Sequence, residues 1–242
     1  MHYIILLKKI KKMNDVILIE DLTCYGGCSA LIDIPILTEY GISFSFIPSL
    51  ILSKHTGNKK PVIIDFKNSF AKIYSDILPN AKALFIGYMP NNIDFAIFND
   101  FVGDIYYDPA MADNGRFYSG FEDDFINKIK PLIKRTKVIT PNLTEARFIT
   151  KKENIDDIFK EFKKLGANIV VITGIEENDK IGVICEYNNI RFNYFHEKIV
   201  GKFYGTGDMF KSVLFSLLYQ NEELEEAIKK ASLYVLNKIK KT

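Results

Sequence analysis

The sequence predicts an α/β fold with three layers: a mainly parallel central sheet, helices on both of its faces, and an antiparallel edge near the C-terminus. Three observations carry this prediction. Short apolar runs rich in β-branched residues alternate with amphipathic helical runs along most of the 242 residues. Apolar residues make up 48% of the chain, which is ample for a large core. Towards the C-terminus the alternation changes to two strand-like runs joined by a two-residue turn.

The first element is a strand–helix–strand unit. Residues 15–19 form a short apolar run typical of a buried parallel strand. Residues 29–40 then predict a helix that ends at Gly41, and residues 42–47 predict a second strand. A crossover helix between two strands favours a parallel sheet covered on both faces.

The alternation continues to Gly174, after which the pattern changes. Residues 181–187 and 190–196, separated by Asn188-Asn189, predict an antiparallel hairpin. Further strands are predicted at residues 62–66, 83–89, 104–107, 138–140 and 169–173, and helices at 71–78, 93–101, 121–133, 144–149, 155–165, 209–219 and 222–240.

Composition excludes several classes of protein. The net charge is only +2 and acids and bases are interspersed, so no basic face for nucleic acid is expected. No apolar run reaches the roughly 18 residues that a membrane-spanning helix needs. The three cysteines, Cys24, Cys28 and Cys185, are an odd number without a C-x-x-C pair, which favours a reducing cytoplasm over a disulfide framework.

The N-terminus carries a short apolar run followed by lysines, the reverse of a signal peptide. We therefore expect residues 1–12 to be a loosely attached extension and residues 13–242 to form a single domain.

The tetrapeptide Gly205-Thr206-Gly207-Asp208 precedes an amphipathic helical run. Glycines at a helix start leave backbone N–H groups uncovered, and the helix dipole adds positive charge there, which together suit a phosphate. Asp208 would then stand where a carboxylate can accept a proton. This tetrapeptide alone favours the simpler interpretation, a tight turn with Asp208 as an ordinary N-cap, and only the rest of the chain favours a phosphate site.

Polar residues also gather where the predicted strands end, which is where open parallel sheets bind ligands. Each one could singly be a turn or cap residue. Asp108 and Glu145 follow successive strands, and two carboxylates beside a phosphate suggest magnesium. Neither a Walker A loop nor a G-x-G-x-x-G motif is present, which disfavours a P-loop enzyme and a Rossmann dehydrogenase. The residues at the strand ends are Asp21, Ser49, Tyr88, Asp108, Asn142, Glu145 and Thr173.

Several ordered blocks, spread from about residue 15 to about residue 220, resemble a known family. The sequence resembles the pyridoxal/pyridoxamine kinase group of the ribokinase-like superfamily, so a ribokinase-like three-layer fold is expected. The blocks are DLTCYGGCS (21–29), PSLILSKHTG (48–57), Gly87-Tyr88, DPAMADNGR (108–116), ITPNLTE (139–145) and GTGD (205–208).

The resemblance implies a role for each matching residue. Asp208 would be the catalytic base for a 5′-hydroxyl group, and the amides of Gly205, Thr206 and Gly207 would form the anion hole. The other implied roles are ATP binding by Asn142, Glu145, Thr173 and Asp113, a magnesium site at Asp108 and Glu145, and a vitamer pocket lined by Asp21, Ser49, His55 and Tyr88.

The implied activity is ATP-dependent phosphorylation of the 5′-hydroxymethyl group of a B6 vitamer (pyridoxal, pyridoxamine or pyridoxine) in pyridoxal phosphate salvage. Its cofactors are ATP and Mg2+, and a monovalent cation is left open. The alternatives are a hydroxymethylpyrimidine kinase and a non-catalytic binding protein. Relatives are commonly homodimers, so a homodimer is expected. We also interpret the carboxylate of Asp21 as favouring pyridoxamine.

The sequence departs from the family pattern in two segments near the expected vitamer pocket. Residues 58–61 (NKKP) replace the expected aromatic lid, and the segment between Tyr88 and Asp108 is shorter than in the family. Both departures concern pocket shape and closure more than the phosphate chemistry.

Overall fold

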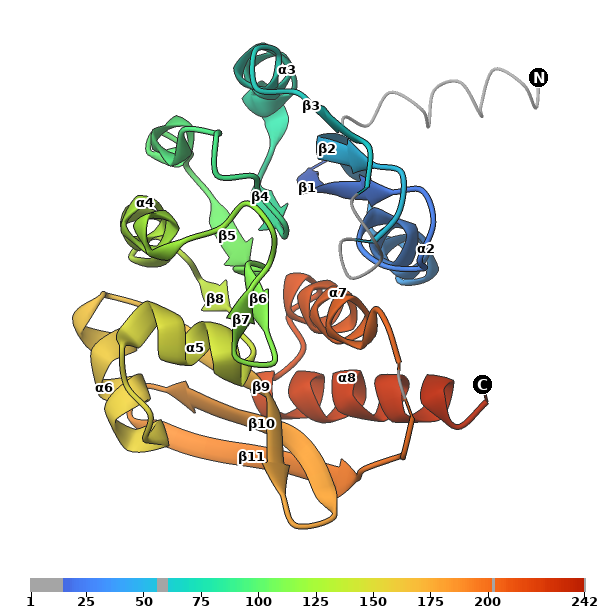
Figure 1. Cartoon of the computed structure of the whole chain (residues 1–242), viewed down its shortest axis with the longest axis vertical. Coiled ribbons are helices and arrows are strands. Elements are labelled where there is room, and N and C mark those ends of the chain that lie inside the picture. The colour runs from blue at the N-terminus through green and yellow to red at the C-terminus, as the bar shows by residue number, and fades with distance from the viewer. Residues whose placement is uncertain (1–14, 56–60, 202, 242) are drawn as a thin grey trace.

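The computed structural model describes residues 15–55, 61–201 and 203–241 of the chain (Figure 1). The predicted extension at residues 1–12 lies outside these residues, as do residues 58–60 of the altered lid. A sheet with the order β11-β10-β9-β8-β5-β4-β1-β2-β3 forms the centre, and β6 and β7 form a separate ribbon. The strands are β1 (Val16–Thr23), β2 (Phe44–Leu52), β3 (Ile63–Asp65), β4 (Ala83–Ile86), β5 (Asp104–Tyr107), β6 (Ala112–Asp113), β7 (Arg116–Phe117), β8 (Val138–Ile139), β9 (Ile169–Glu177), β10 (Lys180–Tyr187) and β11 (Ile190–Glu197).

The six strands that lie in the order β2-β1-β4-β5-β8-β9 in the sheet each pair in parallel with their neighbours in this series. Strands β10 and β11 add an antiparallel edge, as predicted, and β3 pairs antiparallel with β2 at the other edge. The predicted class, a mainly parallel sheet with an antiparallel C-terminal edge, is therefore confirmed.

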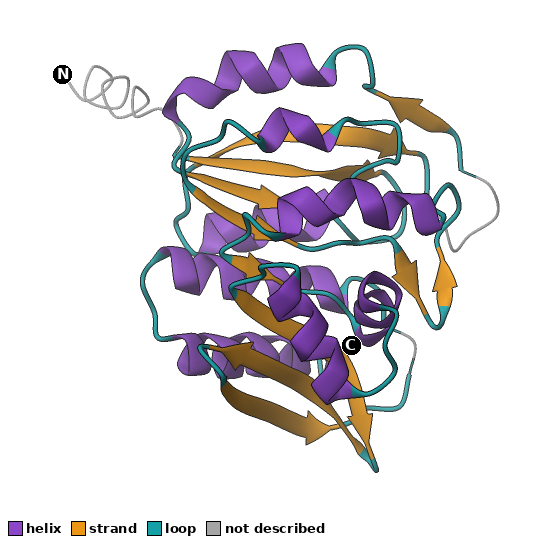
Figure 2. Cartoon of the chain, turned by 90° about the vertical axis from the view of Figure 1, so that its left-hand side faces the viewer, coloured by secondary structure: helices purple, strands orange, loops and turns teal. Residues whose placement is uncertain are grey.

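Helices cover both faces of the sheet (Figures 1 and 2). On one face lie α2 (Ala30–Glu39), α7 (Thr206–Tyr219) and α8 (Leu224–Ile239). On the other lie α3 (Phe70–Ile77), α4 (Asp123–Ile133), α5 (Leu143–Thr150) and α6 (Ile155–Lys164), with short 3-10 turns η1 (Leu78–Asn80) and η2 (Phe95–Phe98). In none of the described ranges is a helix long and apolar enough to cross a membrane.

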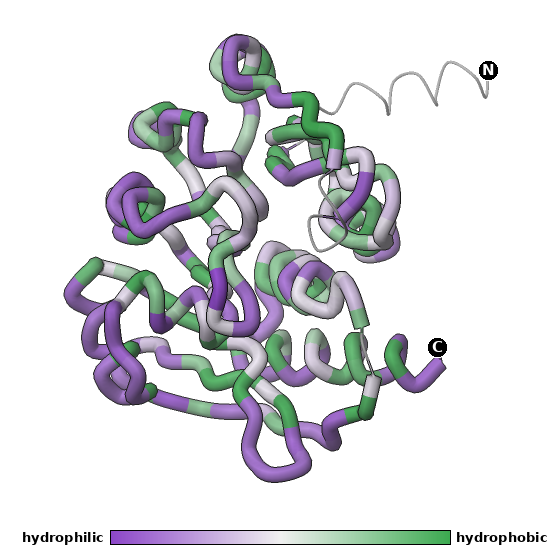
Figure 3. The backbone as a smooth tube through the Cα atoms, in the orientation of Figure 1, coloured by the Kyte–Doolittle hydropathy of each residue, from purple (hydrophilic) through white to green (hydrophobic). Residues whose placement is uncertain are grey.

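Each central strand contributes to two hydrophobic layers. In β1, Ile17 and Ile19 pack towards the face of α3 and α4, whereas Val16 and Leu18 pack towards the face of α2 and α7. Burial on both faces explains why these strands are continuous apolar runs rather than alternating ones. Figure 3 shows hydrophilic residues in the outer turns, such as the turn that joins β9 to β10.

The predicted ends of the first two strands, at Ile19 and Ile47, are wrong. Strand β1 pairs with β4 only from Val16 to Ile19, but it continues beside β2 as far as Thr23, with a register shift after Glu20. Asp21 and Ser49 therefore lie inside strands rather than beyond them. They still project past the end of β4, because β1 and β2 together extend beyond the rest of the sheet.

Other predicted boundaries also differ from the structure, and the strand predicted at residues 83–89 ends at Ile86, before Gly87-Tyr88. Strand β9 does not end at Thr173, because antiparallel pairing with β10 carries it to Glu177. The helix predicted at residues 93–101 is only the 3-10 turn η2, which begins at Asp94, whose side chain accepts a hydrogen bond from the N–H of Ala96. Asp94 thus nucleates one turn, and the chain continues to β5 without a longer helix.

Candidate active site

The start of α7 lies beside the β1–α2 loop. Its N-cap is Gly205, whose φ of 71° is in the left-handed region. A Cβ atom at Gly205 would come within 2.1 Å of Ile32 Cδ1 and 2.8 Å of the carbonyl oxygen of Gly27, so only glycine fits there. No side chain among the described residues caps this helix end. The amides of the first turn are therefore available to an anion.

Asp208 lies in the first turn of α7 and does not cap it, so its interpretation as an ordinary N-cap is wrong. Its Oδ2 accepts a hydrogen bond from the N–H of Ser29 at 2.8 Å, and its Oδ1 lies 2.9 Å from Lys211 Nζ. Ser29 has φ 57° and ψ −135°, a strained conformation for a residue with a side chain, and this aims its N–H at the carboxylate. With 18% of its side chain exposed, Asp208 is held on both oxygens at the rim of the site.

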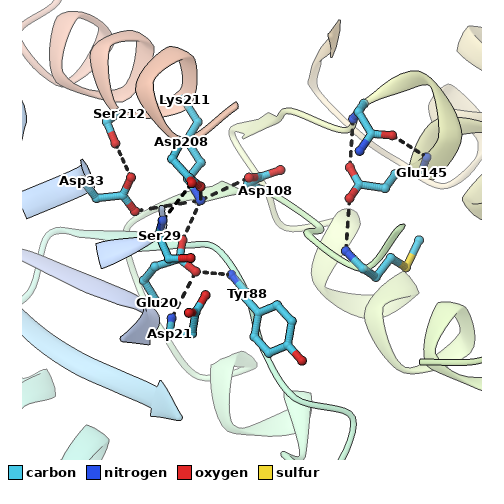
Figure 4. A network of polar contacts seen from close by, with 12 residues as sticks. Glu20, Asp21, Ser29, Asp33, Tyr88, Asp108, Glu145, Asp208, Lys211 and Ser212 are labelled. Atoms are coloured by element: carbon cyan, nitrogen blue, oxygen red, sulfur yellow. Dashed lines mark hydrogen bonds and ion pairs between the residues drawn. The ribbon is translucent and has the colours of Figure 1, made fainter. Parts of the chain in front are cut away.

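Lys211, one helical turn after Asp208, is the centre of an acidic cluster (Figure 4). Only 3% of its side chain is exposed. The Nζ atom lies 2.5 Å from Glu20 Oε2 and 3.2 Å from Asp108 Oδ2. It is also 3.9 Å from Oδ2 of Asp33, whose Oδ1 accepts a hydrogen bond from the hydroxyl of Ser212. One buried ammonium group thus balances carboxylates from β1, α2, α7 and the loop after β5.

This balance decides which carboxylates keep their charge. Burial raises the pKa of Asp208, but the Lys211 ammonium and the Ser29 N–H outweigh burial and hold that pKa below its ordinary value. Burial raises the pKa of Asp108 to about 6 in spite of Lys211. Burial likewise raises the pKa of Asp33 well above its ordinary range. Asp208 is therefore the carboxylate of this cluster that stays most fully ionised near neutral pH.

Glu20 connects this cluster to the next segment of chain. Its Oε1 accepts hydrogen bonds from the N–H groups of Tyr88 at 2.7 Å and Asp21 at 3.1 Å. A Cβ atom at Gly87 would come within 1.7 Å of Glu20 Oε2, so Gly87 provides the space for this carboxylate. The Gly87-Tyr88 backbone is thereby anchored beside the end of β1.

The residues predicted to line a vitamer pocket lie near one another around the extended ends of β1 and β2. Asp21 accepts a 2.5 Å hydrogen bond from the Thr23 hydroxyl, and burial followed by the charge of Glu20 raises its pKa to about 7. Burial raises the pKa of Tyr88, and the nearby charge of Asp21 raises it further. His55 packs its ring against Tyr204 at 5.6 Å.

Ser49 has a fully buried side chain, yet its hydroxyl has no hydrogen-bond partner among the described residues. A buried hydroxyl without a partner is uncommon in native proteins.

The residues predicted to bind ATP form a second group (Figure 4). Asn142 is the N-cap of α5 and forms a capping box with Glu145. The side-chain amide of Asn142 also donates a 2.8 Å hydrogen bond from Nδ2 to the carbonyl of Ala112, which connects α5 to the β6–β7 ribbon. The N–H of Thr173 bonds to the carbonyl of Pro141, and Thr173 forms a bridge with Asn142.

The predicted metal pair, Asp108 and Glu145, is divided between these two groups. Asp108 contacts Lys211, whereas the oxygens of the buried Glu145 accept hydrogen bonds from the N–H groups of Met111, Ala112 and Asn142. Burial, followed by the charge of Asp108, raises the pKa of Glu145 well above its ordinary value. The two carboxylates therefore interact across the site without a shared contact.

Within the described ranges, no group of three or more His, Cys, Asp or Glu side chains is arranged to hold a metal ion. A magnesium ion held mainly by phosphate oxygens and water needs only one or two carboxylates, and this set fits that mode. Asp113 is exposed in the β6–β7 ribbon, where its side chain accepts hydrogen bonds from Asn114.

Sequence reasoning missed three residues of the site: Glu20, Asp33 and Lys211. Asp33 and Lys211 are charged residues inside runs that are otherwise apolar, Glu20 directly follows such a run, and all three are buried. Lys and Asp are almost never fully buried unless they are paired. A charge inside a core-facing stretch was therefore the signal, but its partners lie up to 191 positions away in the sequence.

Comparison with known proteins defines the class first. The model of the phosphomethylpyrimidine kinase family matches residues 96–242, more than half of the chain. The protein belongs to this family of kinases. The ribokinase-like fold and the resemblance to pyridoxal kinases are both confirmed by its relatives.

Individual relatives make the likeness more specific. A Caenorhabditis elegans protein provisionally named pyridoxal kinase is 25% identical over 243 aligned residues, covering 85% of this chain and 75% of its own. A Bacteroides thetaiotaomicron protein provisionally named phosphomethylpyrimidine kinase, crystallised with pyridoxal, has 27% identity and a TM-score of 0.86, covering 96% of this chain and 89% of its own. Pyridoxal kinase from Entamoeba histolytica has 25% identity and a TM-score of 0.86, covering 95% and 90%.

Proposed function

We propose that the protein is an ATP-dependent kinase that phosphorylates the 5′-hydroxymethyl group of a B6 vitamer, in salvage towards pyridoxal 5′-phosphate. One observation carries the proposal. Asp208, ionised and held on both oxygens, lies in the first turn of a helix whose N-terminal amides have no side-chain cap. Transfer of a phosphoryl group to a hydroxyl requires a proton acceptor and a site that binds the anionic group, and this helix end offers both.

In this mechanism the vitamer hydroxyl oxygen attacks the γ-phosphorus of ATP and gives its proton to Asp208, while the bond from that phosphorus to the β–γ bridging oxygen breaks and ADP leaves. The amides of Gly205, Thr206 and Gly207 bind the oxygens of the transferring group. Phosphoryl transfer depends mainly on positioning and charge neutralisation, so these backbone groups supply much of the chemistry. The low pKa of Asp208 keeps it unprotonated at neutral pH and ready to accept.

ATP and magnesium complete the proposal. Asn142, Glu145, Thr173 and Asp113 are proposed to face the nucleotide, and Asp108 and Glu145 to hold Mg2+ partly through water. When bound, Mg2+ neutralises charge on the phosphates. The requirement for a monovalent cation is left to measurement.

The vitamer pocket is proposed at Asp21, Ser49, His55 and Tyr88. Its support is the unpartnered Ser49 hydroxyl and the similar Bacteroides protein that was crystallised with pyridoxal. We propose further that the carboxyl group of Asp21 pairs with a ring nitrogen or an amine and so favours pyridoxamine. If Asp21→Ser has the same ratio of kcat/KM for pyridoxamine and pyridoxal as the wild type, this preference has another origin.

Assembly and location belong to the same proposal. We expect a homodimer, which light scattering of the purified protein would test. The cytoplasm is proposed as the location because Cys24, Cys28 and Cys185 are all unpaired, as is usual in a reducing compartment.

The decisive experiment measures ADP release with Mg-ATP and, in parallel, pyridoxal, pyridoxamine, pyridoxine or hydroxymethylpyrimidine. We expect turnover with at least one B6 vitamer. Asp208→Asn should lower kcat by about 10²–10⁴-fold, the usual contribution of a positioned general base. Asp157→Asn, a similar change at an ion pair on the surface of α6, is the control and should retain activity.

Other outcomes identify the alternatives. Turnover of hydroxymethylpyrimidine alone would assign the second candidate function, which the family description favours. A folded protein that binds pyridoxal without releasing ADP would instead be a non-catalytic binding protein.

A further inference from the structure

We propose that Lys211 is a positioning residue of this active site: its buried ammonium group holds Asp208 in place and joins it to Asp108 and Glu20. The inference rests on the proposed function, because Asp208 acts as a proton acceptor only if the protein transfers a phosphoryl group to a hydroxyl. Nothing in the resemblance to other kinases assigned a role to this lysine. It follows from contacts within the chain.

The number of nearby carboxylate oxygens matches the ammonium group. A lysine ammonium has three N–H donors. Three carboxylate oxygens lie within hydrogen-bond reach of Nζ, at 2.5 Å (Glu20), 2.9 Å (Asp208) and 3.2 Å (Asp108). These oxygens come from β1, α7 and the loop after β5, which are far apart in the sequence. Lys211 is thus the point at which three elements of the site meet (Figure 4).

The position of Lys211 on α7 shows that it is not there for packing. Its helical neighbours Phe210, Val213, Leu214 and Phe215 are buried in the hydrophobic layer. Replacing a whole buried ion pair by apolar residues of similar volume is often neutral or stabilising, so packing alone does not require Lys211 and its carboxylates at this place. A charge kept at this position therefore points to a role in the site.

The contacts of Asp208 show what that role is. Its Oδ2 is fixed by the Ser29 N–H, and its Oδ1 is fixed by Lys211. Without the ammonium, Oδ1 would face Asp108 with no cation between the two carboxylates. Repulsion would then turn the Asp208 side chain about the bond to its remaining partner. A displacement of about 1 Å at a reacting group can lower the rate by about 10²-fold.

Glu20 extends the same unit towards the vitamer pocket. One of its oxygens binds Lys211, while the other accepts the N–H groups of Asp21 and Tyr88. Gly87 leaves the space that this carboxylate occupies. A single ammonium group therefore fixes the proton acceptor relative to the backbone that carries two proposed vitamer contacts.

The test compares Lys211→Met with the double variant Lys211→Met/Glu20→Gln. The single variant leaves buried carboxylates without their cation and is prone to misfold. The double variant removes one positive and one negative charge, so it keeps the charge balance of the core. Lys137→Met, which breaks an ion pair with Asp104 on the surface, is the matched control.

We expect the folded double variant to lose about 10²-fold in kcat, while KM for ATP changes less than threefold. A purely structural role would lower stability without this selective loss of kcat. Lys137→Met should keep both constants. A double variant with kcat within about threefold of the wild type would overturn the proposal.

A crystal structure of the double variant gives a second readout that does not depend on turnover. We expect Asp208 Oδ1 to leave its original position, with Oδ2 still near the Ser29 N–H, or the carboxylate to occupy more than one orientation. An Asp208 side chain in its original position would contradict the proposal. If the wild type itself turns over no substrate, the proposed function fails, and the crystal structure alone still decides whether Lys211 positions Asp208.

Discussion

At the scale of single residues, the site is defined by charges that are buried yet differ in protonation. Asp208 keeps its charge because an ammonium and an amide face its two oxygens, whereas burial and the neighbouring charge of Glu20 raise the pKa of Asp21, so Asp21 binds a proton more readily. Asp208 and Asp21 lie within electrostatic reach of each other, yet the pKa of Asp208 is below the ordinary value for aspartate and that of Asp21 is above it. Such a difference is typical of active sites, where one acid must be ionised and another can donate a hydrogen bond.

The raised pKa of Asp21 predicts a pH dependence of stability. Its pKa is about 7 in the folded protein against an ordinary 3.8, so between pH 4 and 7 the folded state holds a proton that the unfolded state has lost. The free energy of unfolding therefore falls as pH rises through this window. Asp21→Asn removes the effect, so its stability relative to the wild type should increase from pH 4 to pH 7, by at most about 4 kcal/mol at 1.36 kcal/mol per pKa unit.

Urea unfolding of both proteins at several pH values measures this difference. Asn at this position can still accept the hydrogen bond from Thr23, so the local contact is retained. Parallel curves for the two proteins across the window would contradict the assignment to Asp21.

Two glycines in the same tetrapeptide offer a sharp comparison. Gly205→Ala places a methyl group against Ile32 and Gly27 at a φ of 71°, and we expect a loss of about 1–3 kcal/mol in stability together with lower kcat. Gly207→Ala meets no atom within 4 Å inside a helix, so it should keep or slightly raise stability, since alanine favours helices by about 1 kcal/mol over glycine. Chemical unfolding of both variants checks this, and equal losses would mean that the contacts of Gly205 with Ile32 and Gly27 are not the cause.

At the scale of elements, α5 is both a helix and a clamp. Its capping box closes the helix end, while the same Asn142 holds the carbonyl of Ala112 in the loop that follows β5. Glu145 completes the clamp by accepting N–H groups from that loop. The ATP side of the proposed site is therefore shaped by a helix cap.

Asn142→Ala tests this double role. Loss of the cap should lower stability by about 0.5–2 kcal/mol, and release of the loop should also lower kcat/KM for ATP. The matched control is Asn154→Ala, which removes the N-cap of α6, where the Asn154 side chain accepts the N–H of Asp156. We expect Asn154→Ala to lower stability comparably and to leave kcat/KM for ATP unchanged. Equal activity of the two variants would show that Asn142 is only a cap.

At the scale of the whole molecule, the sheet separates two hydrophobic layers. The site lies at the ends of the parallel strands and takes residues from elements of both layers. Helix α7 belongs to one layer through Phe215, which stacks on Phe85 with ring centroids 4.6 Å apart. Asn142 and Glu145 are carried by α5, which packs on the opposite layer through Ala146 and Ile149. The relative positions of the two halves of the site thus depend on the packing of the entire sheet.

Phe215→Ala should accordingly affect both stability and activity. We expect a loss of about 3–5 kcal/mol, the usual range for a buried phenylalanine, and a lower kcat because α7 carries Asp208. Val102→Ala, at a position that is 91% exposed, should change stability by less than about 0.5 kcal/mol. Thermal and urea unfolding measure the first effect, and ADP release measures the second. A Phe215→Ala protein as stable as the wild type would mean that this layer does not hold α7.

Most of the fold could be predicted because each of its signals is local. Apolar runs such as residues 104–107 match their strand, and glycines such as Gly41 and Gly205 mark element ends, since conformational preference and hydrophobic period act over a few residues. The predicted boundaries failed where a distant partner decided them. β1 and β2 lengthen because they pair with each other past β4, and β9 lengthens because β10 returns beside it.

The candidate site likewise has a part that the sequence predicted and a part that it did not. By itself, the order of polar residues along the chain determined that Asp21, Asp108, Asn142 and Asp208 would gather at one edge of a parallel sheet, because all strands of such a sheet end together. Only the tertiary structure decided that Lys211 lies among the carboxylates and that Asp108 and Glu145 belong to different groups of contacts. The physical reason is that the charge state of a buried group depends on what surrounds it in space, and those neighbours come from distant parts of the chain.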